Sequence, residues 1–134
     1  MPSKRLSKSN ILLIASTAMA TISLGFGINA ILNPSNALSF FEFDYPTDPP
    51  TQKLIDNLMI IYGVCDIFWG IAMYAPAYYG DRKSLGWICL AGSGVAFADG
   101  AVCFAAGKGE WGHWGYAPAL TAIGSMLLGI FDKA

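Results

Sequence analysis

The chain has 134 residues, of which 54% are hydrophobic and only 13% are charged, with a formal net charge of -1 at pH 7. A soluble domain of this size cannot bury so much apolar surface, so the composition indicates one integral membrane domain, residues 1–134. The near-zero net charge excludes the basic surface that nucleic-acid binding needs, and the lipid bilayer is the expected partner.

The cysteines and the single histidine argue against redox and metal chemistry. Cys65, Cys89 and Cys103 are odd in number, lie in apolar runs and form no C-x-x-C pair, so a disulfide framework is not expected. One histidine without clustered thiolates does not make a zinc or haem site. We therefore expect no metal and no other cofactor.

The first apolar run, residues 11–32, follows a short basic segment. This arrangement resembles a signal peptide, but about 20 apolar residues also span a bilayer, and we interpret the run as a retained first helix. Small and polar residues recur at every fourth position of it and share one face, which we expect to point inward: Thr17, Thr21, Gly25 and Asn29.

The connection from residue 33 to residue 53 begins with Asn33-Pro34, which ends the helix, and contains an aromatic cluster, Phe40, Phe41, Phe43 and Tyr45. It is long for a connection in a tight bundle. Three interpretations stay open. The segment folds over the helix ends as a lid, it lies along the membrane interface, or it is a loose connection with aromatics in the headgroup zone.

Three further apolar runs, residues 54–76, 85–107 and 113–131, complete an all-α bundle of four transmembrane helices. Six Lys and Arg residues fall on one side of it and two, Lys53 and Lys108, on the other; the six are Lys4, Arg5, Lys8, Arg82, Lys83 and Lys133. This bias predicts cytosolic termini and a lumenal 33–53 loop. Small residues at four-residue spacing, such as Gly63, Gly92 and Gly129, are expected to let the helices approach closely.

Two acids inside these runs, Asp66 and Asp99, are the candidate catalytic residues. An ionisable side chain in mid-membrane costs about 3 kcal/mol or more, so it usually faces a protein interior or a wet cavity. Polar residues of all four helices fall on the same half of the bundle, which predicts a cavity open to the lumenal or outer face. We expect Phe68 and Phe104 among its walls. The candidate substrate-binding residues are Asn29, Asp56, Tyr62, Trp69, Phe97, Cys103 and His113.

The paired acids suit proton transfer without a cofactor. One carboxyl kept from water can stay protonated and act as a general acid, while its partner acts as a base or stabilises a developing cation. The expected reaction is opening of an epoxide, or cyclisation or isomerisation of a lipophilic small molecule. The alternative is a non-catalytic membrane subunit or small-molecule-binding protein, in which the acids accept hydrogen bonds and fix helix packing. A homo-oligomer is compatible with either, and transport would require one.

Three segments carry a family resemblance: Gly63-Val64-Cys65-Asp66, residues 79–86 and Ala98-Asp99-Gly100. Over residues 54–129 the chain resembles a mostly fungal family of small four-helix integral membrane proteins with a domain of unknown function, similar in architecture to DoxX-type membrane proteins. The resemblance implies this fold and an association with secondary metabolism, on polyketides or terpenoids, in a multi-pass protein of the endoplasmic reticulum. Family members often carry Arg before the first acid, so with Cys65 in that place Asp66 lacks a neighbouring cation.

Overall fold

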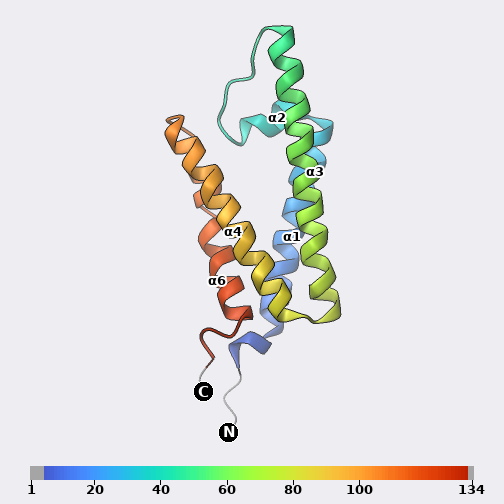
Figure 1. Cartoon of the computed structure of the whole chain (residues 1–134), viewed down its shortest axis with the longest axis vertical. Coiled ribbons are helices and arrows are strands. Elements are labelled where there is room, and N and C mark those ends of the chain that lie inside the picture. Colours follow the sequence, from blue (N-terminus) through green and yellow to red (C-terminus); the bar gives the residue numbers. More distant parts are fainter. Residues whose placement is uncertain (1–4, 133–134) are drawn as a thin grey trace.

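The computed structural model describes residues 5–132, which form helices and contain no strand (Figure 1). The all-α class is thereby confirmed. After a short 3-10 helix, η1 (Leu6–Lys8), come α1 (Asn10–Leu32), α2 (Pro34–Ser39), α3 (Pro49–Tyr79), α4 (Arg82–Ala105), α5 (Trp111–Trp114) and α6 (Ala117–Leu127). Of the helices in this part of the chain, α1, α3 and α4 are long and apolar enough to cross a membrane.

The predicted fourth span, residues 113–131, is not one helix in the structure. It is divided between α5 and α6, and α6 ends at Leu127. Pro118 lies in the first turn of α6, where its missing N–H costs nothing, and Gly129 has a φ of 80°, which ends the helical segment. The 11 residues of α6 rise about 16 Å, which is shorter than the hydrocarbon core of a bilayer.

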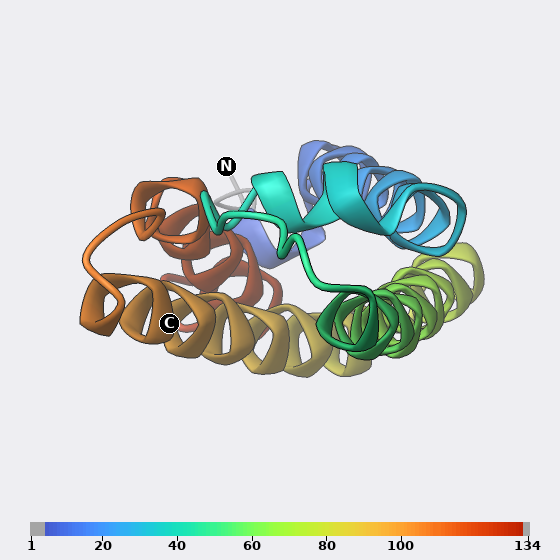
Figure 2. The ribbon, with the colours of Figure 1, turned by 90° about the horizontal axis from the view of Figure 1, so that it is seen from above.

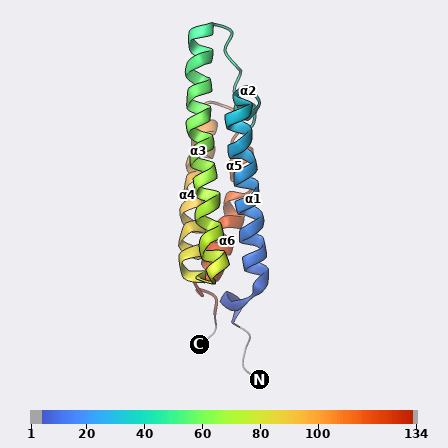
Figure 3. The same ribbon diagram turned by 90° about the vertical axis from the view of Figure 1, so that its right-hand side faces the viewer.

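The helices pack mainly as two pairs, α1 with α3 and α4 with the shorter α6 (Figures 2 and 3). Glycines bring the backbones of each pair together. A Cβ on Gly27 would lie 2.5 Å from the Gly63 carbonyl oxygen, and one on Gly63 would lie 2.6 Å from that of Gly27. Gly86 and Gly124 face each other in the same way, at 3.0 and 2.8 Å. The prediction that small residues allow close helix approach is confirmed at Gly63.

The inward face of α1 is not the predicted one. Its buried residues are Leu12, Ser16, Ala20, Ser23, Gly27 and Ala30. Thr21 is exposed, and a Cβ on Gly25 would have no neighbour within 4 Å. Both threonine hydroxyls donate within the helix, Thr17 to the carbonyl of Leu13 and Thr21 to that of Thr17, and the Thr21 hydroxyl also forms a hydrogen bond with the Tyr74 hydroxyl of α3. A hydroxyl bonded to its own helix does not need a buried position between helices.

At one end of the molecule hydrogen bonds join the two pairs; this end, with Ser7, Ser9, Arg82 and Asp132, is called the tied end below. The Arg82 guanidinium donates to the backbone carbonyls of Ser7 and Ser9 at 3.2 and 2.8 Å, and the Ser7 hydroxyl donates to Asp132. The helix η1, the α3–α4 turn and the end of the described chain therefore lie together (Figure 1). Lys4 and Lys133, two of the six basic residues expected on the cytosolic side, lie outside the described residues.

At the opposite end the pairs diverge, and α2 lies between them (Figures 1 and 2). This part of the 33–53 connection packs through Ala37 and Leu38 against Ala30 of α1 and Met59 of α3. It is therefore an ordered part of the fold and not a loose connection. Residues 37–42 are called the cover segment below.

Candidate functional site

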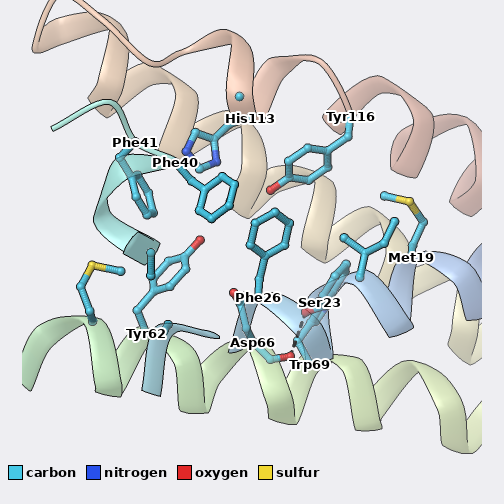
Figure 4. A pocket seen from close by; sticks show the side chains of 15 residues that line it. Met19, Ser23, Phe26, Phe40, Phe41, Tyr62, Asp66, Trp69, His113 and Tyr116 are labelled. Atoms are coloured by element: carbon cyan, nitrogen blue, oxygen red, sulfur yellow. Dashed lines mark hydrogen bonds between the residues drawn. The ribbon is translucent and has the colours of Figure 1, made fainter. Parts of the chain in front are cut away.

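A cavity of about 310 Å³ lies between the two helix pairs (Figure 4). Its walls come from α1, the cover segment, α3, and the region of α5 and Tyr116. Most of the lining is apolar or aromatic. The side chains labelled in Figure 4 are Met19, Ser23, Phe26, Phe40, Phe41, Tyr62, Asp66, Trp69, His113 and Tyr116. The volume falls within the range of small-molecule sites, about 300–1,000 Å³.

Asp66 is the acidic side chain of this wall. It is half-buried, and its backbone carbonyl accepts a hydrogen bond of 2.8 Å from the Ser23 hydroxyl. Within residues 5–132 its carboxyl group receives no hydrogen bond from another side chain. The carboxyl group is thus left available to a molecule in the cavity.

Asp99 lies next to the cavity and does not line it. Its Oδ2 accepts a hydrogen bond of 3.1 Å from the hydroxyl of Tyr62, which does line the cavity. Tyr62 and Asp66 are one turn apart on α3, so the tyrosine stands beside both acids. The two acids therefore belong to one polar group made from α3 and α4.

The structure brings three more of the predicted site residues to this cavity: Tyr62, Trp69 and His113. His113 is buried in α5, and its imidazole ring lies 4.8 Å from the ring of Phe41. The sequence placed His113 at the mouth of a cavity. The structure places it in the wall, because the cover segment closes over it.

Other predicted site residues lie elsewhere. Asn29 donates to Asn36 at 3.0 Å, and Asp56 accepts from Tyr45 at 2.7 Å, both away from the cavity lining. Phe97 lines a separate, shallower hollow beside α6, and Cys103 is buried on α4. Asn29 and Asp56 thus have hydrogen-bond partners outside the cavity lining, and Cys103 is packed within the bundle. Phe97 is 43% exposed, so its ring lies at the surface.

The predicted aromatic walls Phe68 and Phe104 are wrong. They are 67% and 63% exposed, so they face outward. Lipid tails are as apolar as a protein interior, so hydrophobicity alone does not tell which face of a membrane helix is buried.

Residues from the cover segment complete the cavity, and the sequence did not identify them as site residues. Phe41 lies with its ring 5.4 Å from that of Tyr62, and Phe40 contacts Phe26 edge-on at 4.9 Å. A Cβ on Gly109 would lie 2.2 Å from the Phe41 carbonyl oxygen, so the α4–α5 connection holds the segment in place. The aromatic cluster after Asn33-Pro34 was the feature of the sequence that could have identified them. Among the three interpretations of the 33–53 connection, this geometry favours the lid.

The described residues contain neither a group of metal ligands nor a disulfide. Among residues 5–132 no three His, Cys, Asp or Glu side chains are grouped so that they could hold a metal ion. Cys65 is exposed, whereas Cys89 and Cys103 are buried, and all three are free thiols.

Comparison with known proteins identifies the family but no characterised relative. No curated protein and no solved structure matches the chain. Residues 20–127 match the family described as Domain of unknown function (DUF4267). This range includes most of α1, both acids and the cavity residues from Phe26 to Tyr116. It therefore extends further toward the N-terminus than the resemblance over residues 54–129. The chain belongs to the DUF4267 family of unknown function.

Proposed function

We propose that this protein is a membrane-embedded acid–base enzyme that opens an epoxide, or cyclises or isomerises a lipophilic metabolite, with Asp66 and Asp99 as its catalytic pair. The observation that carries the proposal is the Asp66 carboxyl group, which has no side-chain partner within residues 5–132, in the wall of an aromatic cavity. An ionisable group held away from lipid and facing a cavity is the usual mark of function in a membrane helix.

In this mechanism Asp66, in its protonated form, donates its proton to an epoxide oxygen or a double bond. For the epoxide, the C–O bond breaks, its electron pair stays on the oxygen, and a hydroxyl group and a carbocation result. The faces of Phe26, Phe41 and Trp69 stabilise the cation, because aromatic faces attract positive charge. A double bond of the substrate then attacks the cation to close a ring, or the cation loses a proton directly.

The departing proton passes to Asp99. The Tyr62 hydroxyl accepts it from the substrate and releases its own proton along the hydrogen bond to the Asp99 carboxylate. Asp99 ends protonated and Asp66 ends ionised, so exchange of one proton between the neighbouring acids restores the starting state. These steps move only protons and electron pairs of the substrate and the named side chains, so they require no cofactor.

We also propose an orientation of the protein in the membrane and its location in the cell. Both termini face the cytosol and the cover segment faces the lumen of the endoplasmic reticulum, with α5 and α6 together acting as the fourth element of the bundle. The basic residues at the tied end and the three long apolar helices support this placement. The likeness to DoxX-type proteins and the fungal distribution stay predictions.

The test is comparative metabolite profiling of cells that express the wild type, Asp66→Asn, Asp99→Asn or no protein. The substitution keeps the shape of the side chain and removes proton exchange. We expect the rate of conversion to fall about 100-fold or more in each Asp66 and Asp99 variant, which is the lower end of what general acid–base groups contribute. Asp44→Asn is the matched control, because this exposed acid pairs with Lys108 outside the cavity. Conversion at the wild-type rate by both well-expressed cavity variants would refute the proposal.

A non-catalytic ligand-binding protein is the second candidate. The observation in its favour is the Tyr62–Asp99 hydrogen bond, which joins α3 to α4 and by itself explains an acid inside an apolar helix. An asparagine at position 99 still accepts this bond through its amide oxygen. On this interpretation Asp99→Asn keeps full function in the cell, whereas Tyr62→Phe weakens assembly.

A further inference from the structure

His113 carries polar groups for which the protein provides no partner. The residue is 5% exposed, and within residues 5–132 neither Nδ1 nor Nε2 makes a hydrogen bond. The indole N–H of Trp69, in the same cavity wall, is also buried and unpaired within this part of the chain. Leaving a buried donor or acceptor unpaired costs about 1–3 kcal/mol. Three such atoms around one cavity therefore call for a partner.

The imidazole of His113 is held where it is. Its ring lies against Phe41 at 4.8 Å and Tyr116 at 6.4 Å. The next residue, Trp114, packs its indole on Gly100 and donates to the backbone carbonyl of Phe97 at 3.2 Å. The helix that carries His113 is thus fixed on α4, and the partner of the ring must come from the cavity.

Other polar groups of the wall do not supply this partner. The Ser23 hydroxyl donates to the backbone carbonyl of Asp66, and the Tyr62 hydroxyl donates to Asp99. The Asp66 carboxyl group and the Tyr116 hydroxyl also line the cavity, but within residues 5–132 neither forms a hydrogen bond with His113 or Trp69. Figure 4 shows His113 and Trp69 on opposite sides of the cavity, with Phe26 between them. The two unpaired groups therefore do not serve each other, and each needs its own partner.

We propose that the cavity binds a neutral, lipophilic molecule with two separated oxygen functions, one held by His113 and the other by the Trp69 N–H. Indole N–H only donates, so the group beside Trp69 is an acceptor: a carbonyl, ether or hydroxyl oxygen. A neutral imidazole donates from one nitrogen and accepts at the other, so the group beside His113 is a hydroxyl or a carbonyl. A carboxylate is excluded, because its charge would be buried in an apolar cavity whose lining, among the described residues, contains no Lys or Arg to pair with it.

This inference rests on the proposed function, since it names the substrate class of the same cavity, but its test is binding and not turnover. The sequence contains one histidine, so protein labelled with ¹⁵N-histidine gives ring signals that belong to His113 alone. The full chain in lipid nanodiscs is titrated with 4-hydroxybenzophenone, which has a ketone and a hydroxyl. The matched probe is 4-methyldiphenylmethane, which has nearly the same shape and no oxygen.

We expect the oxygenated probe to move the His113 nitrogen signals and to bind about tenfold more tightly than the hydrocarbon, from hydrogen bonds worth roughly two- to tenfold each. His113→Phe and Trp69→Phe should each lower the ratio of the two probe affinities by roughly two- to tenfold, the contribution of one hydrogen bond. Trp87→Phe, at an indole that is 65% exposed, should leave the preference intact. Equal binding of the two probes by the wild type, or a preference unchanged in both cavity variants, would overturn the assignment.

The result separates the two proposals. Asp66→Asn protein should retain the preference for the oxygenated probe while it loses conversion. Loss of conversion in Asp66→Asn with no probe preference in the wild type refutes the ligand class and leaves the enzyme. A clear preference together with full conversion by Asp66→Asn supports the ligand class and refutes the catalytic role.

Discussion

The indole ring of Trp69 on α3 rests against Gly92 of α4, so closely that a Cβ on the glycine would lie 2.0 Å from the ring. The same indole lines the cavity. The contact therefore connects the packing between the two helix pairs with the shape of the site.

This contact predicts that Gly92→Ala displaces Trp69. Overpacking of this kind costs about 1–3 kcal/mol, so the midpoint of thermal unfolding in detergent should fall and probe binding should weaken. Gly94→Ala is the matched control two residues away, because a Cβ there would meet nothing within 4 Å. An equal change in both variants would show that the Trp69 contact is unimportant.

The cover segment is predicted to depend on Gly109. Gly107 and Gly109 both have left-handed backbone, with φ of 88° and 90°, so alanine at either position costs about 1–2 kcal/mol of backbone strain. A Cβ at Gly109 would also meet the carbonyl of Phe41, whereas one at Gly107 would meet nothing within 4 Å. Gly109→Ala should therefore expose residues 40–48 to limited proteolysis much more than Gly107→Ala does. Matching cleavage rates would mean that the segment is not held from this side.

The contact between Ser7 and Asp132 predicts a pH dependence. The Ser7 hydroxyl and backbone N–H donate to the Asp132 carboxylate at 2.5 and 3.0 Å, and these hydrogen bonds hold its pKa below the ordinary value. Because the folded pKa is the lower one, this stabilisation is present above the unfolded pKa of about 3.9 and is lost as pH falls through the folded value.

Thermal unfolding followed from about pH 5 to about pH 2 checks this dependence. The wild type should lose stability over this range, and Ser7→Ala should lose less, because part of its stabilisation is already gone. Ser35→Ala, on the exposed side of α2, should follow the wild type. Parallel curves for wild type and Ser7→Ala would contradict the role of this contact.

The orientation in the membrane predicts which lysines a membrane-impermeant amine reagent reaches. Lys8 and Lys83 belong to the tied end, and Lys53 and Lys108 to the end with the cover segment; all four are exposed. In sealed vesicles with the lumenal side inside, Lys8 and Lys83 should be the two of these four that are modified, as found by peptide mass spectrometry. Modification of Lys53 and Lys108 instead would reverse the orientation, and detergent should expose all four.

Much of the architecture follows from the sequence, because it depends on local properties. Apolar runs of membrane-spanning length predicted α1, α3 and α4, since a helix is what satisfies the backbone in lipid. Asp66 and Asp99 stood out because ionisable groups are rare in such runs, and Gly63 because close helices need small residues. These features need no knowledge of the neighbouring helix.

Only the tertiary structure decided which faces meet. Phe68 and Phe26 are equally apolar and are 67% and 39% exposed, yet of the two Phe26 lines the cavity. Lipid and protein solvate an aromatic ring alike, so the sequence does not separate them. The cover segment places Phe41 beside His113, a contact across 72 residues that no local pattern encodes. The tertiary structure also determined the hydrogen-bond partners of the polar groups. Asp56 accepts from Tyr45 and Asp99 accepts from Tyr62, whereas the buried His113 ring has no partner in the described chain.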